Sequence, residues 1–159
     1  MTTIKDLTLV PACVDSGATF EEAARLLREN RLASIAVVDA SRKVVGLFTD
    51  EELLLGISPR YLDELRHTAF LEAELPSLRE RAAQVRQESV LEHVRKAVTV
   101  QQDASAVHAA ERFVHTDEAA LAVIDASGRF CGMLERTELA HAMLRRLTAP
   151  TGEPPDRQS

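Results

Sequence analysis

The hydrophobic positions of this chain form two similar series, one in each half of the sequence. Short apolar stretches at 12–14 and 98–100 are each followed by a helical pattern and then by a continuous apolar run, at 33–38 or 119–124. Another apolar stretch follows at 44–48 or 130–134, and a second helical pattern begins at Thr49 or Glu135. Continuous apolar runs of this length are typical of strands buried on both faces. Each series therefore predicts the order strand–helix–strand–strand–helix.

Local signals support this order. Thr19 and Glu22 have the spacing of a capping box, in which each side chain bonds the backbone N–H of the other residue. Apolar residues at 20, 23, 24 and 27 then share one helix face, and Ser105 begins the equivalent helix in the second series. Gly46 and Gly132 interrupt the last strand of each series. A glycine inside a strand indicates close approach of another backbone or a kink.

The two series are copies of one unit. Residues 12–53 align with residues 98–139 without a gap at an offset of 86, and 13 of the 42 positions are identical. The shared positions include an Asp-Ala-Ser turn at 39–41 and 125–127, set between matching apolar runs. Two unrelated segments of similar composition would not be expected to share this detail. The sequence therefore predicts a duplication, with a first repeat at 1–57 and a second at 88–147.

The segment between the copies, 58–87, has no counterpart in the repeat. Ser58 and Pro59 form a helix start, because proline is favoured at the first helical position, and Pro76 with Ser77 predicts a second helix start. We expect a helical insert that packs on the outside as a spacer, with a dimer surface or a lid as the alternatives. The tail at 148–159 is rich in proline, and we expect it to be disordered.

Composition and sequence pattern argue against several classes of function. The 159 residues carry a formal net charge of −6 and 4% aromatic residues with no tryptophan, which disfavours nucleic-acid binding. No apolar run approaches the roughly 20 residues that span a bilayer, and the polar N-terminus is unlike a signal peptide. Cys13 and Cys131 are not in a C-x-x-C spacing, which argues against a disulfide framework or a cysteine zinc site. We expect a cytoplasmic protein that does not bind membranes.

Signs of catalysis are missing from the sequence. It contains no G-x-x-x-x-G-K-[ST] phosphate loop and no G-x-S-x-G elbow, and its cysteines lie in apolar runs where thiols are usually inert. We therefore predict that the chain is not an enzyme. His108, Glu111 and His115 share a helix face and could bind a metal ion, but they align with solvent-side positions, so we predict no metal site. The remaining histidines are predicted to be isolated surface residues: His67, His93 and His141.

The repeated unit resembles the CBS domain, the module named after cystathionine β-synthase. The similarity rests on AVVDASRKVVGLFTDEEL at 36–53 and AVIDASGRFCGMLERTEL at 122–139, in which an apolar strand, a turn, a glycine-bearing strand and a helix start follow one another. The resemblance implies an α/β fold. Two βαββα repeats would pack about a pseudo-twofold axis, with the extra helical insert between them.

The resemblance also implies a function. Paired CBS domains are regulatory modules, and many bind AMP, ADP, ATP or S-adenosylmethionine in clefts between the repeats. In the family the Asp of a Thr-x-x-Asp motif takes the ribose hydroxyls, and the Thr approaches phosphate at a helix N-terminus, which attracts anions. Thr49 matches this motif here, and Glu52 stands at the ribose position. In the second copy Glu138 stands there, while Glu135 replaces the hydroxyl and would repel phosphate unless Arg136 or a metal compensates. We therefore favour the first site.

Four apolar residues lie where the family usually lines the base pocket. They are Val14 and Ile35 in the first copy, and Val100 and Leu121 in the second. The alternative interpretation of all four is plain hydrophobic core.

Two functions follow as hypotheses. The first is a stand-alone regulatory CBS-pair module, a ligand sensor that binds an adenosine-containing ligand and signals to an unidentified protein partner. The second is a ligand-free interaction or dimerisation module with degenerate nucleotide sites, which the Glu-for-Asp changes favour. In either case we expect a homodimer and no catalytic cofactor.

Overall fold

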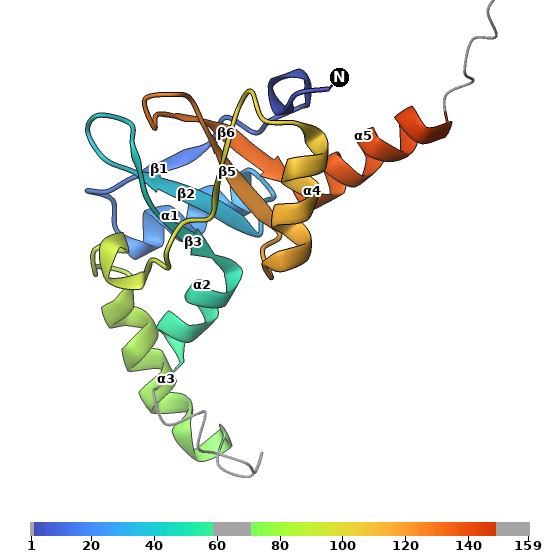
Figure 1. Cartoon of the computed structure of the whole chain (residues 1–159). Helices are drawn as coiled ribbons and strands as arrows, with labels where there is room; N and C mark the ends of the chain where they lie inside the picture. Colours follow the sequence, from blue (N-terminus) through green and yellow to red (C-terminus); the bar gives the residue numbers. More distant parts are fainter. Residues whose placement is uncertain (1, 59–70, 149–159) are drawn as a thin grey trace, which may run out of the picture.

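Two three-stranded sheets form the centre of the protein, seen in a computed structural model that describes residues 2–58 and 71–148 (Figure 1). In each sheet the first strand is parallel to the second, and the third is antiparallel to the second. The sheets contain β1 (Cys13–Asp15), β2 (Ser34–Val38) and β3 (Val44–Thr49), and β4 (Thr99–Gln101), β5 (Ala120–Ile124) and β6 (Phe130–Glu135). These strands confirm the order predicted from the apolar runs.

Helices follow the strands as the sequence predicts. The capping box of α1 forms, since the Thr19 hydroxyl accepts from the Glu22 amide at 3.2 Å and the Glu22 carboxylate accepts from the Thr19 amide at 2.9 Å. Ser105 caps the equivalent helix α4 through the amide of His108 at 3.1 Å. The helices of the two repeats are α1 (Phe20–Glu29) and α2 (Asp50–Ile57), and α4 (Ala106–His115) and α5 (Arg136–Thr148). No helix among the described residues is long and apolar enough to cross a membrane.

The N-terminal segment of each repeat pairs with the other repeat. Thr3 bridges Ser105, and the same contact recurs 86 positions on, where Ser89 bridges Thr19. The Lys43–Arg129 bridge joins two positions that are themselves 86 apart, so it lies on the pseudo-twofold axis. This reciprocal exchange holds the two repeats together.

The repeats also share one hydrophobic core. The larger cluster joins Val37 and Phe48 of the first repeat to Ala122 and Met133 of the second, all fully buried. A unit of about 50 residues buries too little surface to be stable alone. A core shared between the two copies increases the buried surface of each.

Gly46 in β3 lets the segment before β4 lie against that strand. Leu47 and Arg95 exchange two backbone hydrogen bonds, of 3.0 and 2.9 Å. A Cβ atom on Gly46 would lie 2.9 Å from the Cβ of Val94 and 3.0 Å from the carbonyl oxygen of Arg95. The close approach predicted from a glycine inside a strand is therefore confirmed.

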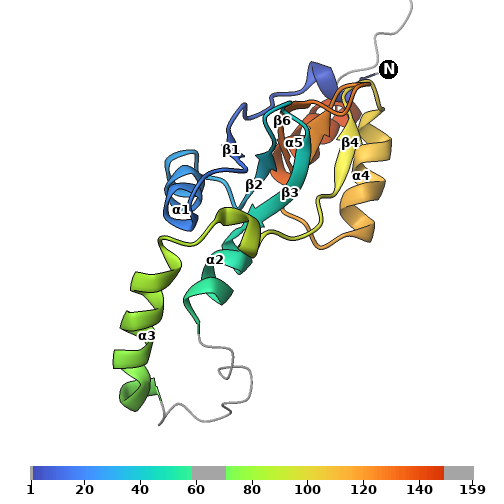
Figure 2. The same cartoon turned by 90° about the vertical axis from the view of Figure 1, so that its left-hand side faces the viewer.

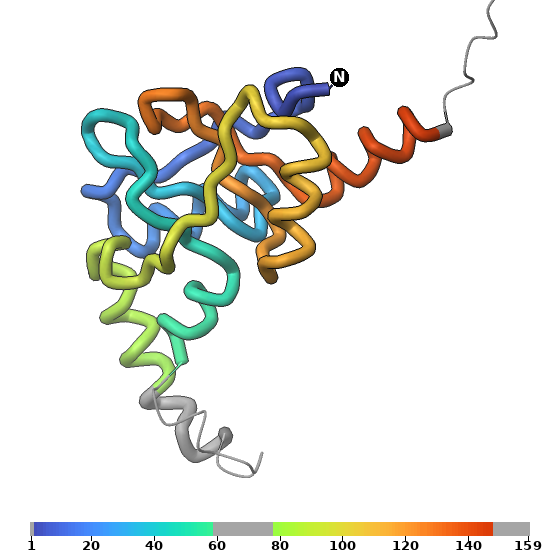
Figure 3. The backbone as a smooth tube through the Cα atoms, viewed as in Figure 1, coloured from blue at the N-terminus to red at the C-terminus, as the bar shows by residue number. Residues whose placement is uncertain are grey.

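The insert contributes α3 (Leu71–Val85), which lies beside α2 and extends away from the sheets (Figure 2). The predicted helix start at Pro76 is wrong, because α3 runs through it as one helix. After α3 the chain turns back across the first repeat through the 3-10 helix η4 (Val90–His93), as the tube in Figure 3 shows. The helix start predicted at Pro59 lies in 59–70, outside the described residues. The tail was predicted to be disordered from 148, but Thr148 is the last residue of α5, and 149–159 lie outside the described residues.

Candidate functional site

The N-terminus of α2 is closed by its own side chains. Thr49 is buried and caps the helix, and its hydroxyl accepts from the amide of Glu51 at 3.2 Å. Glu52 completes a capping box, because its carboxylate accepts from the Thr49 amide at 3.2 Å and from the Thr49 hydroxyl. The two residues that sequence reasoning placed at the first site are therefore in direct contact, and Glu52 already has a structural partner.

Arg95 links this helix end to the second repeat. Its guanidinium donates from Nε to Glu52 at 2.7 Å and from Nη2 to Glu51 at 2.5 Å. Nη1 donates to Glu118, just before β5, at 3.4 Å. Arg95 comes from the segment that pairs with β3, so the close approach at Gly46 places this side chain. One guanidinium thus connects carboxylates of both repeats.

The protonation of this cluster follows from these contacts. Burial alone would raise the pKa of Glu52, but hydrogen bonds from Arg95 and Thr49 outweigh it and hold the pKa below the ordinary value. For Arg95, burial would lower the pKa, and hydrogen bonds to Glu52 and Glu51 outweigh it and raise the pKa. Both groups stay charged at neutral pH.

A small cleft of about 60 Å³ opens beside Arg95, between the repeats. Ser34 on its wall is 1% exposed, and its buried hydroxyl has no hydrogen-bond partner within the part of the chain that the structure describes. Four carboxylates and one guanidinium share the cleft with it. Its lining residues are Ala33, Ser34, Thr49, Asp50, Glu51, Arg95, Asp117, Glu118 and Ala119.

A larger cleft of about 750 Å³ lies between α2, α3 and η4. Glu52 lines it, while its ion-pair partner Arg95 lines the small cleft, so this pair stands between the two spaces. The insert builds part of the wall through Arg81, whose Nε donates to the carbonyl oxygen of Gly56 at 3.0 Å. The cleft is lined by Glu52, Leu55, Gly56, Ser58, Arg81, Glu88, Glu92, His93 and Val94.

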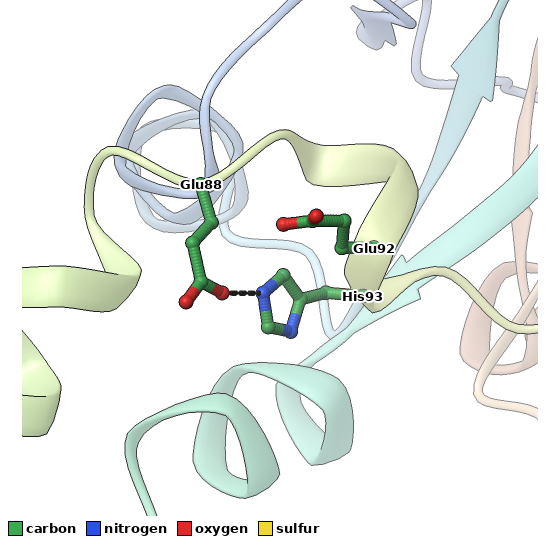
Figure 4. A group of neighbouring side chains, drawn as sticks. All are labelled: Glu88, Glu92 and His93. Atoms are coloured by element: carbon green, nitrogen blue, oxygen red, sulfur yellow. Dashed lines mark hydrogen bonds and ion pairs between the residues drawn. The ribbon is translucent and has the colours of Figure 1, made fainter.

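Three side chains of the larger cleft come together in Figure 4. The carboxylate of Glu88 lies 2.6 Å from Nε2 of His93, and Glu92 is next to them. Their potential ligand atoms lie within 4.8 Å of one another, a spacing that could close around a metal ion. Arg81 already neutralises Glu88 through two hydrogen bonds of 2.6 and 3.1 Å. A metal ion would have to displace that guanidinium.

The prediction that His93 is an isolated surface residue is wrong. Its side chain is only 12% exposed, and its ring meets Phe20 edge-on with centroids 4.8 Å apart. The close packing of Gly56 on Phe20 holds this region together, since a Cβ on Gly56 would lie 2.6 Å from the Phe20 ring. The sequence pattern offered no signal for this packing, because His93 is 73 positions from Phe20 and 37 positions from Gly56.

The residues predicted for the base pocket lie in the core. Val14, Ile35 and Leu121 are fully buried, and Val100 is nearly so. None of the four is among the residues that line the two clefts. Their role in base recognition stays a prediction.

The second copy of the motif is built differently. Glu138 in α5 accepts from the amide of Thr8 at 3.3 Å and pairs with Arg145 at 4.0 Å. In the second repeat, Val10 bridges Met133 of β6. The equivalent bridge in the first repeat joins Arg95 to Leu47 of β3. The second site therefore has a valine where the first has Arg95, and the preference for the first site stays a prediction.

Sequence reasoning missed the residues that connect the repeats: Arg95, Glu118 and Ser34. Arg95 lies outside the repeated motif, in the segment before β4. The burial of Glu118 could have been predicted, because this residue directly precedes the apolar run at 119–124 and can be buried together with it. The burial of the Ser34 hydroxyl without a partner among the described residues depends on tertiary packing, which no sequence pattern describes.

The histidines of α4 and the two cysteines are the remaining candidates for metal or thiol chemistry. His108 and Glu111 form an exposed pair on α4, 3.9 Å apart, and His115 is also exposed. Cys13 and Cys131 are free thiols, and burial raises the pKa of both. A raised pKa lowers the thiolate fraction and with it the reactivity of the sulfur.

Comparisons with known proteins agree on the fold. The family model described as CBS domain matches residues 4–58 and 89–145. No curated protein matches the chain. The structure is similar to CBSX2 from Arabidopsis thaliana, with 21% identity, 91% and 96% of the two chains covered and a TM-score of 0.69. CBSX2 in complex with AMP matches with 20% identity, coverage of 92% and 99%, and a TM-score of 0.66.

A longer protein is similar as well. Protein MJ1004 from Methanocaldococcus jannaschii has 23% identity and a TM-score of 0.68, and the match covers 92% of this chain but only 60% of that one. Since all three identities are below 25%, these structures speak for the fold alone. The family model covers both repeats, and together with the two sheets and the reciprocal bridges between them it gives one conclusion: the chain belongs to the CBS domain family, of which it carries two copies.

Proposed function

We propose that this CBS pair is a regulatory module that binds an adenosine-containing ligand beside Glu52 and passes the event to a protein partner. The observation that carries the proposal is the ion pair of Glu52 with Arg95, which stands between two clefts and joins the repeats. A group that displaces Arg95 from Glu52 also loosens its bond to Glu118 in the second repeat. Ligand binding would in this way change how the repeats are held together.

The dimensions support this arrangement. Pockets for small ligands usually measure about 300–1,000 Å³, and the larger cleft, of about 750 Å³, is in that range. Glu52 on its wall offers two carboxylate oxygens, which suit the two hydroxyls of a ribose. The structurally similar CBSX2 was obtained in complex with AMP, which supports a ligand of this class for the present chain.

The test is a thermal-shift titration with AMP, ADP, ATP and S-adenosylmethionine, each with and without magnesium. A ligand at 100 times its Kd adds about 2.7 kcal/mol to folded stability. For a chain of this length that corresponds to a rise in Tm of roughly 5–10 °C. The wild-type shift should shrink strongly in Glu52→Gln, which keeps the shape of the side chain. It should remain in Glu138→Gln, the matching change in the second repeat.

A second candidate is a ligand-free interaction module, and one observation favours it. Glu52 is already engaged by Arg95 and by the capping box, so a ligand must compete with bonds that exist in the free protein. If no member of the panel raises the Tm at millimolar concentration, this second candidate replaces the first. The search would then turn to protein partners.

We also propose that the chain forms a homodimer through α4 and α5. Val107 and Val114 on α4 and Leu147 on α5 are 70–82% exposed, and a largely apolar groove of about 200 Å³ runs between the two helices. Exposed apolar patches of this kind mark interaction sites. Light scattering coupled to size exclusion should give twice the mass of the chain. Val107→Glu should return the mass to that of a monomer.

A further inference from the structure

The small cleft between the repeats is unusually acidic for a place expected to meet a phosphate. Asp50, Glu51, Asp117 and Glu118 line it, and Arg95 is the one cation among its described lining residues. Acidic residues in the first turn of α2 are also explained by the helix dipole, which favours negative charge there. Asp117 and Glu118 are not in a helix, so the dipole does not account for them.

Glu118 is the most informative of these residues. Its side chain is 10% exposed, and its one polar contact among the described residues is the 3.4 Å bond from Arg95. Buried charges are normally paired closely or bound to metal ions, because removing a charge from water is expensive. A single long contact leaves most of the acceptor capacity of this carboxylate unused.

Ser34 gives a second, independent sign that the cleft takes a ligand. Its hydroxyl is buried with no partner among the described residues, and Ser34 lines the same cleft. Buried polar groups in native proteins nearly always have partners, and the exceptions often mark a missing water, ion or ligand. The volume of about 60 Å³ admits a small group and excludes a nucleoside.

We infer that this cleft receives a positively charged group, so that the module selects ligands that carry a cation and rejects free phosphate. This inference rests on the proposed function and defines the charge of its ligand. The cation can be an organic group, such as the sulfonium of S-adenosylmethionine, or a magnesium ion held by nucleotide phosphates. In both cases it takes over the carboxylates that Arg95 neutralises in the free protein.

Two matched pairs of probes isolate the effect of charge in calorimetric titrations. S-adenosylmethionine and S-adenosylhomocysteine differ by the methyl group that makes the sulfur cationic, and ATP can be offered with magnesium or with EDTA. We expect the cation-bearing member of at least one pair to bind about tenfold more tightly or better. Which pair shows the preference tells the organic cation from the metal ion.

Variants then locate the effect. The preference should disappear in Glu118→Gln and remain in Glu111→Gln, which removes an exposed carboxylate from α4. Ser34→Ala should keep the fold, since the hydroxyl has no hydrogen-bond partner among the described residues, and should weaken the cation-bearing ligand. Arg95→Gln should change ligand affinity in opposite directions for a cation site and for a phosphate site. At a cation site the variant binds the cationic ligand more tightly, because a competing cation is removed. At a site where Arg95 holds phosphate, the variant binds free nucleotide more weakly.

The results that overturn the inference are distinct from those that overturn the proposed function. Equal binding within both pairs, a preference for free nucleotide, or a preference that survives in Glu118→Gln refutes cation selection while ligand binding itself stands. The absence of binding by every probe refutes both.

Discussion

Replacing Gly46 with alanine tests whether close backbone approach is what positions Arg95. The new methyl group would lie 2.9 Å from the Cβ of Val94 and 3.0 Å from the carbonyl oxygen of Arg95. Both neighbours belong to the backbone or sit directly on it, so the segment before β4 must move away from β3. The hydrogen bonds between Leu47 and Arg95 lengthen as it moves.

The magnitude follows from two opposing effects. Inserting a methyl group into a packed site costs about 1–3 kcal/mol, whereas alanine in place of glycine gains about 0.4–1 kcal/mol by restricting the unfolded chain. The net loss is about 1–2 kcal/mol, which lowers the Tm of a chain of this size by roughly 2–8 °C.

The assay is thermal unfolding followed by circular dichroism, with Gly17→Ala as the matched control. A Cβ on Gly17 meets no atom within 4 Å, so that variant should be as stable as the wild type or slightly more stable. Equal stability of the two alanine variants would refute the packing argument.

Three further predictions concern charged residues. Arg95→Gln should lower the free energy of unfolding by about 1–3 kcal/mol in urea titrations, because the buried Glu118 loses its partner; an unchanged midpoint would show that this contact is not formed in solution. The lowered pKa of Glu52 means that its bonds stabilise the fold above the ordinary pKa of 4.5 and that this contribution is lost as the pH falls through the lowered value. Glu52→Gln should therefore reduce the Tm at pH 7 but have little effect near pH 3, and an equal reduction at both would contradict that assignment. Arg81→Ala should speed amide exchange around Gly56 and in the C-terminal half of α3, measured by mass spectrometry, while exchange in β5 serves as an unchanged reference.

The sequence by itself determined the repeat, the order of the strands and the helix starts. These features depend on local physics: apolar runs bury strands, Thr19 and Glu22 form a capping box, and Asp-Ala-Ser supplies a turn. The glycine at 46 even indicated a close approach, although not which segment approaches. Thr49 and Glu52 were identified through the resemblance to the CBS motif, whose two site positions lie three residues apart at one helix end.

Tertiary structure alone decided what surrounds that helix end. Arg95 reaches Glu52 across 43 positions and Glu118 across 23, and no periodicity relates residues so far apart. The same holds for His93, whose ring packs against Phe20 although the two residues are 73 positions apart. Such contacts arise because the N-terminal segment of each repeat crosses to the other repeat. The charge of the cleft therefore depends on how the two copies pack together.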